Sequence, residues 1–412
     1  MNDNYSHRRD TKIMEFTTPE GKPLANERLT VKQLRNSVKF GCSGFESLQV
    51  VSGELEGDEK GFAETRVERM LEIFDLITLP FYWGRFEPVQ GKPDITRTKN
   101  AAEWLIKRGC TVKGHPLCWH TVCADWLLEF SDEEILRKQL ERIDRDVTAF
   151  KGVIDIWDVI NEVVIMPVFD RYDNAVTRIC KREGQAGLVK KVFDEARKAN
   201  PDSVLLINDF DMSTDYSDLV EKLLDAGVCI DVIGLQSHMH QGIWHEEKTL
   251  EVLERFSKFG LPLHFTEINM VSGDLMPPHI VDLNDFVPDH WPSTPEGEAR
   301  QAEDVTSFYK LLFDCPKIEA VTYWSFSDGG WLNAPAGLIA RDGRKKPAYE
   351  ALYNLIKNEW LSPVQQVVTD SNGKAEITGF KGSYVAEYNR DKGTLTEGAV
   401  QRADVLLSHF EI

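Results

Sequence analysis

Residues 154–162, which read IDIWDVINE, give the clearest indication of the fold. Its first six residues are mostly apolar, which is typical of a buried strand in a parallel sheet. The run then ends in the polar pair Asn161-Glu162. Apolar strands that end in polar side chains are typical of (β/α)8 barrels, which place their chemistry at the carboxyl ends of the strands.

Seven further apolar runs lie on either side of this one. They are residues 38–41, 76–79, 111–115, 204–208, 232–236, 263–267 and 320–324. Segments with helical periodicity separate them, among them residues 132–150, 187–200 and 250–259. Eight alternations of strand and helix predict an α/β fold, a (β/α)8 TIM barrel. No glycine-rich phosphate loop follows the first run, which argues against a doubly wound sheet.

The pattern of apolar and polar residues changes after Trp360. Alternating residues at 367–369, 375–377 and 384–388, with an Asn372-Gly373 turn, predict β-hairpins. We therefore expect three parts. They are an N-terminal extension (residues 1–35) that can add a strand to the tail, a catalytic barrel (residues 36–360) and a small C-terminal β module (residues 362–412).

Composition excludes some classes of partner. The net charge of −19 argues against nucleic acid, because phosphate binding needs clustered Lys and Arg. We expect no membrane partner, since the chain lacks an apolar run of about 18 residues. Residues 1–10 contain no apolar signal region, and the seven cysteines are dispersed, as in free thiols of a reducing compartment. These features predict a cytoplasmic location; they leave the oligomeric state undetermined.

Two glutamates end predicted strands that face each other across the barrel mouth. Glu162 ends the fourth run and Glu267 ends the seventh. Retaining glycosidases need two carboxyl groups roughly 5–5.5 Å apart, one as acid and base and one as nucleophile. A single glutamate at a strand end is more often part of a surface salt bridge. Two of them, both flanked by polar and aromatic residues, favour a catalytic pair.

Other polar and aromatic side chains follow the same strand ends. We interpret them as substrate-binding residues, with His238 orienting a carboxylate and the two tryptophans offering apolar platforms to sugar faces. They are His115, Trp119, Asn161, Gln236, His238, Trp324 and Trp331.

A zinc site near the third run is the competing interpretation of His115, Cys118, His120 and Cys123. A structural zinc site needs four converging ligands, usually with a CxxC arm, which is missing here. In an extended chain Cys118 would also point away from His115. We interpret these cysteines as packed thiols and expect neither a metal nor another cofactor.

Several segments resemble glycoside hydrolase family 10, the family of endo-β-1,4-xylanases. The likeness spans roughly residues 20–360, and its motifs occur in the family's order. The matching segments are GHPLCWH (114–120), WDVINE (157–162), INDF (207–210), GLQSH (234–238), TEI (266–268) and KPAY (346–349).

The resemblance implies roles for individual residues. It implies that Glu162 is the acid and base, that Glu267 is the nucleophile and that His238 hydrogen-bonds the nucleophile. Asn161 is expected to contact the sugar hydroxyl beside the scissile bond. The remaining expected subsite residues are His115, Trp119, Gln236, Trp324 and Trp331.

One segment departs from the family pattern. Aligned on Trp83, the chain has Thr78, Leu79 and Tyr82 where the family has Glu, Asn and Lys, which hold sugars on the non-reducing side. Three functions follow as hypotheses. The first is a xylanase-like retaining hydrolase, and the second an intracellular β-glycosidase for short oligosaccharides or a glycosylated small molecule. The third is a carbohydrate-binding barrel without activity.

Overall fold

A computed structural model describes residues 5–389 and 405–412. The chain divides into two compact units, one running from Lys39 to Ala351 and one combining Met1–Val38 with Leu352–Ile412. The larger unit is therefore shorter at both ends than the predicted barrel of residues 36–360. The segment up to Trp360 belongs with the terminal unit, where Asn36 Nδ2 donates to Trp360 O at 2.8 Å.

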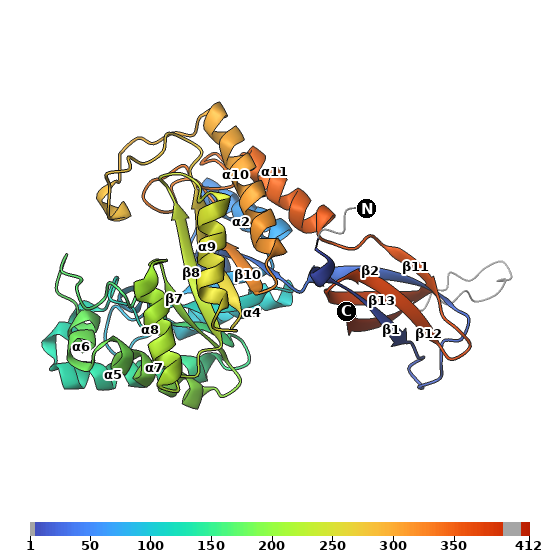
Figure 1. The fold of residues 1–412 in the computed structure, drawn as a ribbon, viewed down its shortest axis with the longest axis horizontal. Helices are drawn as coiled ribbons and strands as arrows, with labels where there is room; N and C mark the ends of the chain where they lie inside the picture. Colours follow the sequence, from blue (N-terminus) through green and yellow to red (C-terminus); the bar gives the residue numbers. More distant parts are fainter. Residues whose placement is uncertain (1–4, 390–404) are drawn as a thin grey trace. The chain divides into compact units, whose positions relative to one another are not determined.

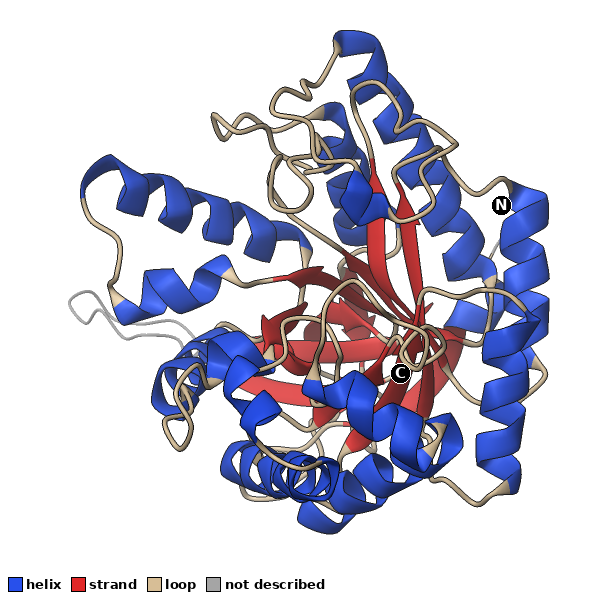
Figure 2. Cartoon of the chain, turned by 90° about the vertical axis from the view of Figure 1, so that its left-hand side faces the viewer, coloured by secondary structure: helices blue, strands red, loops and turns tan. Residues whose placement is uncertain are grey.

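The larger unit is a closed barrel of parallel strands (Figures 1 and 2). Its strands are paired in the order β10-β3-β4-β5-β6-β7-β8-β9. Each predicted apolar run falls on one of them, so the prediction of a TIM barrel is confirmed. The strands are β3 (Lys39–Ser43), β4 (Leu76–Pro80), β5 (Thr111–His115), β6 (Ile156–Asn161), β7 (Val204–Asp209), β8 (Val232–Met239), β9 (Leu263–Met270) and β10 (Ile318–Tyr323).

Helices surround these strands, as Figure 2 shows. Helix α5 shows why such a helix begins where it does, because Ser131 and Glu134 form a reciprocal capping box at its first turn. The elements are α1 (Glu46–Ser52), α2 (Gly57–Ile73), α3 (Trp83–Phe86), α4 (Ile95–Lys107), η2 (Asp125–Glu129), α5 (Asp132–Phe150), α6 (Ala175–Glu183), α7 (Gln185–Ala199), α8 (Thr214–Asp225), α9 (Glu246–Ser257), η3 (Leu283–Asp285) and α10 (Pro295–Asp314). Helix α11 (Pro347–Asn354) and the π-helical turn η4 (Leu355–Glu359) lead into the terminal unit.

Close packing inside the barrel explains one glycine of the motifs. Trp157 on β6 is fully buried, and its ring lies against residue 114 of β5. A Cβ atom at residue 114 would come within 2.2 Å of that ring. Gly114 is therefore required for Trp157 to occupy the barrel interior.

The smaller unit consists of antiparallel sheets built from both ends of the chain. Strand β1 pairs with β12, and the other strands pair in the order β11-β2-β13-β14. The N-terminal extension thus supplies two strands to these sheets. Residues 390–404 of the predicted module lie outside the described residues. The strands are β1 (Arg9–Glu15), β2 (Arg28–Asn36), β11 (Gln365–Val368), β12 (Lys374–Phe380), β13 (Gly382–Asn389) and β14 (Val405–Glu411), preceded by η1 (Ser6–Arg8).

This unit has a hydrophobic core of its own. Phe16, Leu29 and Val31 from the N-terminal segment pack with Ile377 and Tyr384 from the tail. The alternation of apolar and polar residues in β12 accounts for this, since every second side chain faces the core. The two ends of the chain therefore fold together.

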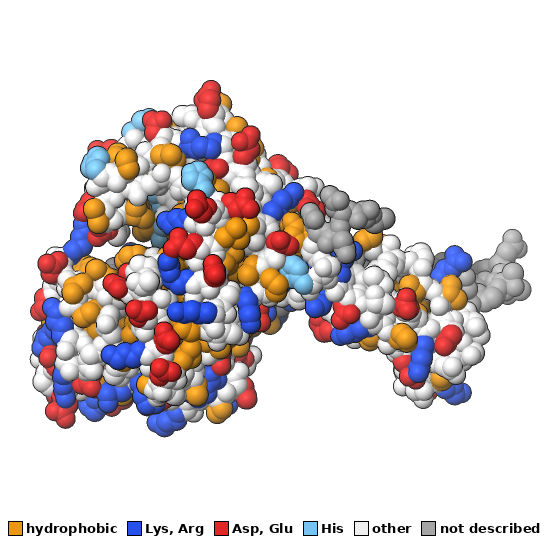
Figure 3. All heavy atoms as spheres, in the orientation of Figure 1, with side chains coloured by type: hydrophobic (Ala, Val, Ile, Leu, Met, Phe, Trp, Pro, Cys, Tyr) orange, Lys and Arg blue, Asp and Glu red, His pale blue; other side chains and the backbone are white. Residues whose placement is uncertain are grey.

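Two surface properties bear on possible partners. None of the helices in the described ranges is both long and apolar enough to cross a bilayer. On the face shown in Figure 3, basic and acidic side chains are interspersed. Neither sign of charge gathers into a separate patch on this face.

Candidate active site

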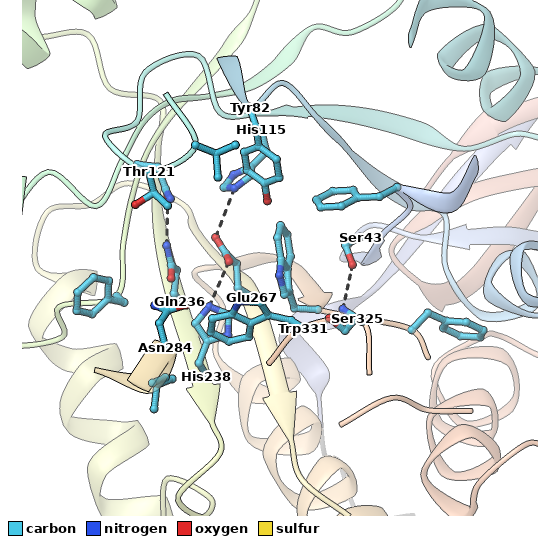
Figure 4. A pocket seen from close by; sticks show the side chains of 18 of the residues that line it. Ser43, Tyr82, His115, Thr121, Gln236, His238, Glu267, Asn284, Ser325 and Trp331 are labelled. Atoms are coloured by element: carbon cyan, nitrogen blue, oxygen red, sulfur yellow. Dashed lines mark hydrogen bonds and ion pairs between the residues drawn. The ribbon is translucent and has the colours of Figure 1, made fainter. Parts of the chain in front are cut away.

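One cavity of about 1000 Å³ lies at the carboxyl ends of the barrel strands. All of the side chains that the sequence singled out line it, although they come from five different strand ends. Figure 4 shows part of this lining. The predicted residues in the lining are His115, Trp119, Asn161, Glu162, Gln236, His238, Glu267, Trp324 and Trp331.

Glu162 follows β6 at a sharp backbone turn. Its φ of 57° lies in the left-handed region, which is costly for a residue with a side chain and often marks a functional site. The turn is held by a 2.8 Å hydrogen bond from Glu162 N to Asn208 O. Three donors reach the carboxylate: Trp119 Nε1 at 2.8 Å, and Asn161 Nδ2 and Gln236 Nε2 at 3.2 Å each.

Glu267 lies on β9 and is 4% exposed. Asn208 Nδ2 donates to its Oε1 at 3.0 Å, and His238 Nε2 lies 3.2 Å from its Oε2. His115 Nε2 lies 3.9 Å from Oε1. Figure 4 shows His115 and His238 approaching this carboxylate from opposite sides. Glu267 is thus held between two imidazoles and an amide.

A chain of side-chain amides connects the two carboxylates. Asn161 Oδ1 accepts hydrogen bonds from Asn208 Nδ2 at 2.7 Å and from Gln236 Nε2 at 3.1 Å. These two donors also bind Glu267 and Glu162 respectively. A shift of one carboxylate would therefore disturb the partners of the other.

A glycine makes room for this amide chain. A Cβ at residue 234 would lie 2.5 Å from Asn208 Oδ1, so Gly234 permits the close approach of β7 to β8. Thr266 Oγ1 donates to the same oxygen at 2.7 Å. With its oxygen engaged in this way, the Asn208 amide must turn its NH₂ group toward Glu267 and Asn161.

The surroundings drive the pKa values of the two glutamates in opposite directions. Burial, and then the charge of Glu267, raise the pKa of Glu162 to about 7, against the hydrogen bonds from Trp119 and Gln236. Burial also works to raise the pKa of Glu267, but the hydrogen bond from His238 and the charges of His115 and His238 outweigh it, so this pKa is lowered. Near neutral pH one carboxyl can hold a proton while the other is ionised.

A buried ion pair supports His115 from below. Lys113 Nζ lies 2.8 Å from Asp158 Oδ2, and His115 Nδ1 lies 2.7 Å from the same oxygen. Burial works to raise the pKa of Asp158, but Lys113 and His115 outweigh it and bring the value to about 2. The ionised Asp158 therefore orients His115 so that its Nε2 faces Glu267.

Aromatic rings form one wall of the cavity. The ring centroids of Trp324 lie 5.3 Å from His115 and 5.5 Å from Phe45, and Tyr82 lies 5.3 Å from Trp119. Trp331 lies 4.5 Å from His238 on another side. Flat apolar rings of this kind can pack against the C–H faces of a sugar.

The segment that departs from the family pattern contributes only one side chain to the cavity. Thr78 is fully buried, and neither Thr78 nor Leu79 is part of the lining. Tyr82 lines the cavity, and its hydroxyl has no hydrogen bond to a described residue. Burial, with the charges of Glu267 and Glu162, raises its pKa well above the usual value. Tyr82 is therefore a neutral donor facing the cavity.

Sequence reasoning did not select several residues that the geometry shows to matter. Asn208, Asp158 and Asn269 are polar residues at or near strand ends, a signal that would have identified them. Phe45 lies in a loop and carries no such signal. Loop residues of this kind are recognised only from the cavity they line.

A zinc site is the competing interpretation of the His and Cys residues at and after the end of β5. Within the described ranges, no three or more His, Cys, Asp or Glu side chains are placed to hold a metal ion together. Cys118 is a fully buried free thiol, and His120 packs against Phe169 with ring centroids 4.4 Å apart. These contacts account for both residues by packing alone.

Comparison with known proteins agrees with this geometry. Residues 66–355 match the family described as Glycosyl hydrolase family 10. Endo-1,4-beta-xylanase B of Thermotoga neapolitana is 26% identical over 72% of this chain and 85% of its own length. Endo-1,4-beta-xylanase C of Paenibacillus barcinonensis is 27% identical over 71% of this chain, which spans only 30% of that relative.

The fold has close counterparts among solved structures. Native xylanase 10B from Thermotoga maritima superposes with a TM-score of 0.63 at 24% identity, covering 78% of this chain and 96% of that one. The chain belongs to glycosyl hydrolase family 10 and is therefore a glycoside hydrolase. It is a retaining, xylanase-like enzyme whose substrate is a carbohydrate.

Proposed function

We propose that this enzyme hydrolyses β-1,4-linked, xylose-configured glycosides, with Glu162 as acid and base and Glu267 as nucleophile. One observation carries the proposal. Two carboxyl groups with oppositely shifted pKa values line the same cavity and share a chain of amides. The two roles require that one group be protonated and the other ionised before the reaction begins.

The reaction proceeds in two displacements. Glu267 attacks the anomeric carbon while Glu162 gives its proton to the leaving oxygen, so the glycosidic bond breaks and a glycosyl ester of Glu267 forms. Glu162, now ionised, takes a proton from water as that water attacks the same carbon. The ester bond then breaks, and the anomeric configuration of the substrate is restored.

His238 keeps the nucleophile ionised and in place. Its Nδ1 lies 2.6 Å from Asn269 Oδ1, and Nε2 faces Glu267. The Asn269 amide donates through Nδ2 to Trp324 O, so its oxygen must face the imidazole. Each ring nitrogen of His238 therefore faces an oxygen acceptor, which fixes the orientation of the imidazole beside Glu267.

The proposal of a xylose-configured substrate rests on the relatives. The curated relatives described above are named as endo-1,4-beta-xylanases, which favours a xylose-configured substrate. The non-reducing side, however, presents Tyr82 and the aromatic wall of Phe45 and Trp324. We expect the Tyr82 hydroxyl and ring stacking to take the place of the Glu, Asn and Lys side chains that the family has on this side.

Alanine variants of the two glutamates test the assignment, with a pair of aryl β-xylobiosides that differ in leaving-group quality. Glu162→Ala is expected to lose roughly 10²- to 10⁴-fold in kcat on the poor leaving group and much less on the activated one. Glu267→Ala is expected to lose turnover on both. Glu254→Ala, an exposed α9 residue outside the cavity lining, is the matched control.

Added azide separates the two roles. It should restore turnover of Glu267→Ala and give the inverted glycosyl azide, whereas Glu162→Ala should give the retained one. Wild-type turnover by Glu267→Ala would refute the assignment. Binding without turnover by the native enzyme across xylo-, gluco- and aryl-glycosides would instead support the carbohydrate-binding alternative.

A further inference from the structure

Two long loops that contribute residues to the cavity lining are joined by ion pairs. Arg171 lies on the loop that follows β6 and Glu162, and Asp282 and Asp285 lie on the loop that follows β9 and Glu267. Arg171 Nη1 is 3.0 Å from Asp282 Oδ2, and Nη2 contacts Asp285 Oδ1. We call this bridge, residues 281–285 with Arg171, the strap. In Figure 1 both loops extend along the left side of the barrel.

The loop after β9 is held in place by its own contacts. Ile280, Leu283 and Phe286 pack on a small hydrophobic cluster that includes Met276 and Trp291. This packing holds the loop in addition to the ion pairs with Arg171.

Hydrogen bonds also tie this loop to the loop after β8. Gln241 Nε2 donates to Pro277 O at 2.9 Å and to Ile280 O at 2.8 Å. Met276 N donates to His240 O at 2.9 Å. The loop that carries the strap is therefore tied to the loop after β8, and Arg171 ties it to the loop after β6.

The strap covers the leaving-group side of the cavity. Glu162 would protonate the leaving oxygen, so the leaving group borders the loop that follows Glu162, where Ile165 and Phe169 line the cavity. Phe210 after β7 and Leu283 of the strap also line the cavity. In Figure 4, Asn284 of the strap appears on the side where Gln236, a partner of Glu162, also lies.

We propose that the strap makes the enzyme select glycosides with a short or compact, apolar-faced leaving group over long polysaccharide chains. The inference rests on the proposed function, because it takes Glu162 as the acid. A compact group fits beneath the strap against Ile165, Phe169 and Phe210. A long chain leaving on this side must displace the ion pairs between the two loops.

The exposure of the ion pairs makes this selection sensitive to salt. The side chains of Arg171, Asp282 and Asp285 are 38%, 41% and 56% exposed. Ion pairs this exposed are weak and are screened by salt, whereas the buried catalytic groups are screened much less. Raising the ionic strength should thus loosen the strap without disturbing the chemistry.

The experiment compares kcat/KM for polymeric xylan with kcat/KM for an aryl β-xylobioside. Arg171→Ala should raise the xylan-to-aryl ratio roughly three- to tenfold. In the native enzyme this ratio should rise with added sodium chloride, and in Arg171→Ala it should not. Arg178→Ala is the matched control, because Arg178 forms a similarly exposed ion pair with Asp132 and does not line the cavity.

A charge swap tests whether the changed ratio in Arg171→Ala comes from the lost ion pairs or from a disturbed fold. The triple variant Arg171→Asp, Asp282→Arg, Asp285→Arg should restore the native ratio and its salt dependence. If Arg171→Ala has the native xylan-to-aryl ratio of kcat/KM and still hydrolyses the aryl substrate, the proposed role of the strap is refuted. The proposed function would be unaffected by that result. A native enzyme that cleaves neither substrate would overturn the proposed function itself.

Discussion

The indole of Trp119 donates a 2.8 Å hydrogen bond to Glu162 Oε2, and it does so from the loop of a neighbouring strand. This bond stabilises the ionised carboxylate, while burial and the charge of Glu267 favour the protonated one. The balance brings the pKa of Glu162 to about 7, a suitable value for a group that must donate and then accept a proton.

Removal of this donor should move the pH profile in a known direction. In Trp119→Phe the ionised form of Glu162 loses a partner, so its pKa should rise and the basic limb of the kcat/KM profile should shift upward by about one pH unit. The control is Trp126→Phe, since Trp126 donates to Glu87 O and does not line the cavity. A basic limb that stays in place would show that the bond does not tune Glu162.

The acid limb should respond to His238. In His238→Gln the carboxylate of Glu267 loses the hydrogen bond and the positive charge that lower its pKa. Burial then dominates, so the acid limb of kcat/KM should move to higher pH and activity near pH 5 should fall. His245→Gln, at an exposed position before α9, should leave the profile unchanged. An unshifted acid limb in His238→Gln would contradict this account.

The raised pKa of Glu162 also has a consequence for stability. The folded value of about 7 exceeds the ordinary 4.5, so between these values the native chain holds a proton that the unfolded chain has released. The contribution of Glu162 to stability is therefore full below about pH 4 and is lost as pH rises through 7. The free energy of unfolding of Glu162→Gln should therefore be about 3 kcal/mol higher than that of the native enzyme at pH 8, and equal to it at pH 4.

Urea unfolding at several pH values measures this difference. Glu254→Gln, altered at an exposed position, should follow the native curve throughout. A Glu162→Gln advantage that stays constant from pH 4 to pH 8 would show that Glu162 has an ordinary pKa in the folded state.

The buried ion pair between Lys113 and Asp158 should contribute to the stability of the fold. Lys113→Met leaves Asp158 as a buried charge with His115 as its remaining partner, which should destabilise the fold by about 3–5 kcal/mol. The double variant Lys113→Met, Asp158→Asn removes both charges and should recover part of this loss. Thermal unfolding measures both, and a Lys113→Met variant as stable as the native enzyme would contradict the assigned role.

Local patterns of residues were enough to predict the barrel and the convergence of its site. Apolar runs such as residues 204–208 and 263–267 are local patterns, and the strands of a parallel barrel bring their carboxyl ends to one face. Polar residues that end those runs, such as Gln236 and Glu267, must therefore meet. The family motifs around Glu162 could be recognised for the same reason, because each is short and continuous.

Properties that depend on residues far apart in the chain are set by the tertiary structure. It placed Tyr82 in the cavity while burying Thr78, a distinction that alignment with the family did not reveal. It also brought Arg171 to Asp282 and joined the two chain ends into one unit. The opposite pKa shifts arise from burial and from charges on other strands. Such effects act through space, so no local pattern of residues encodes them.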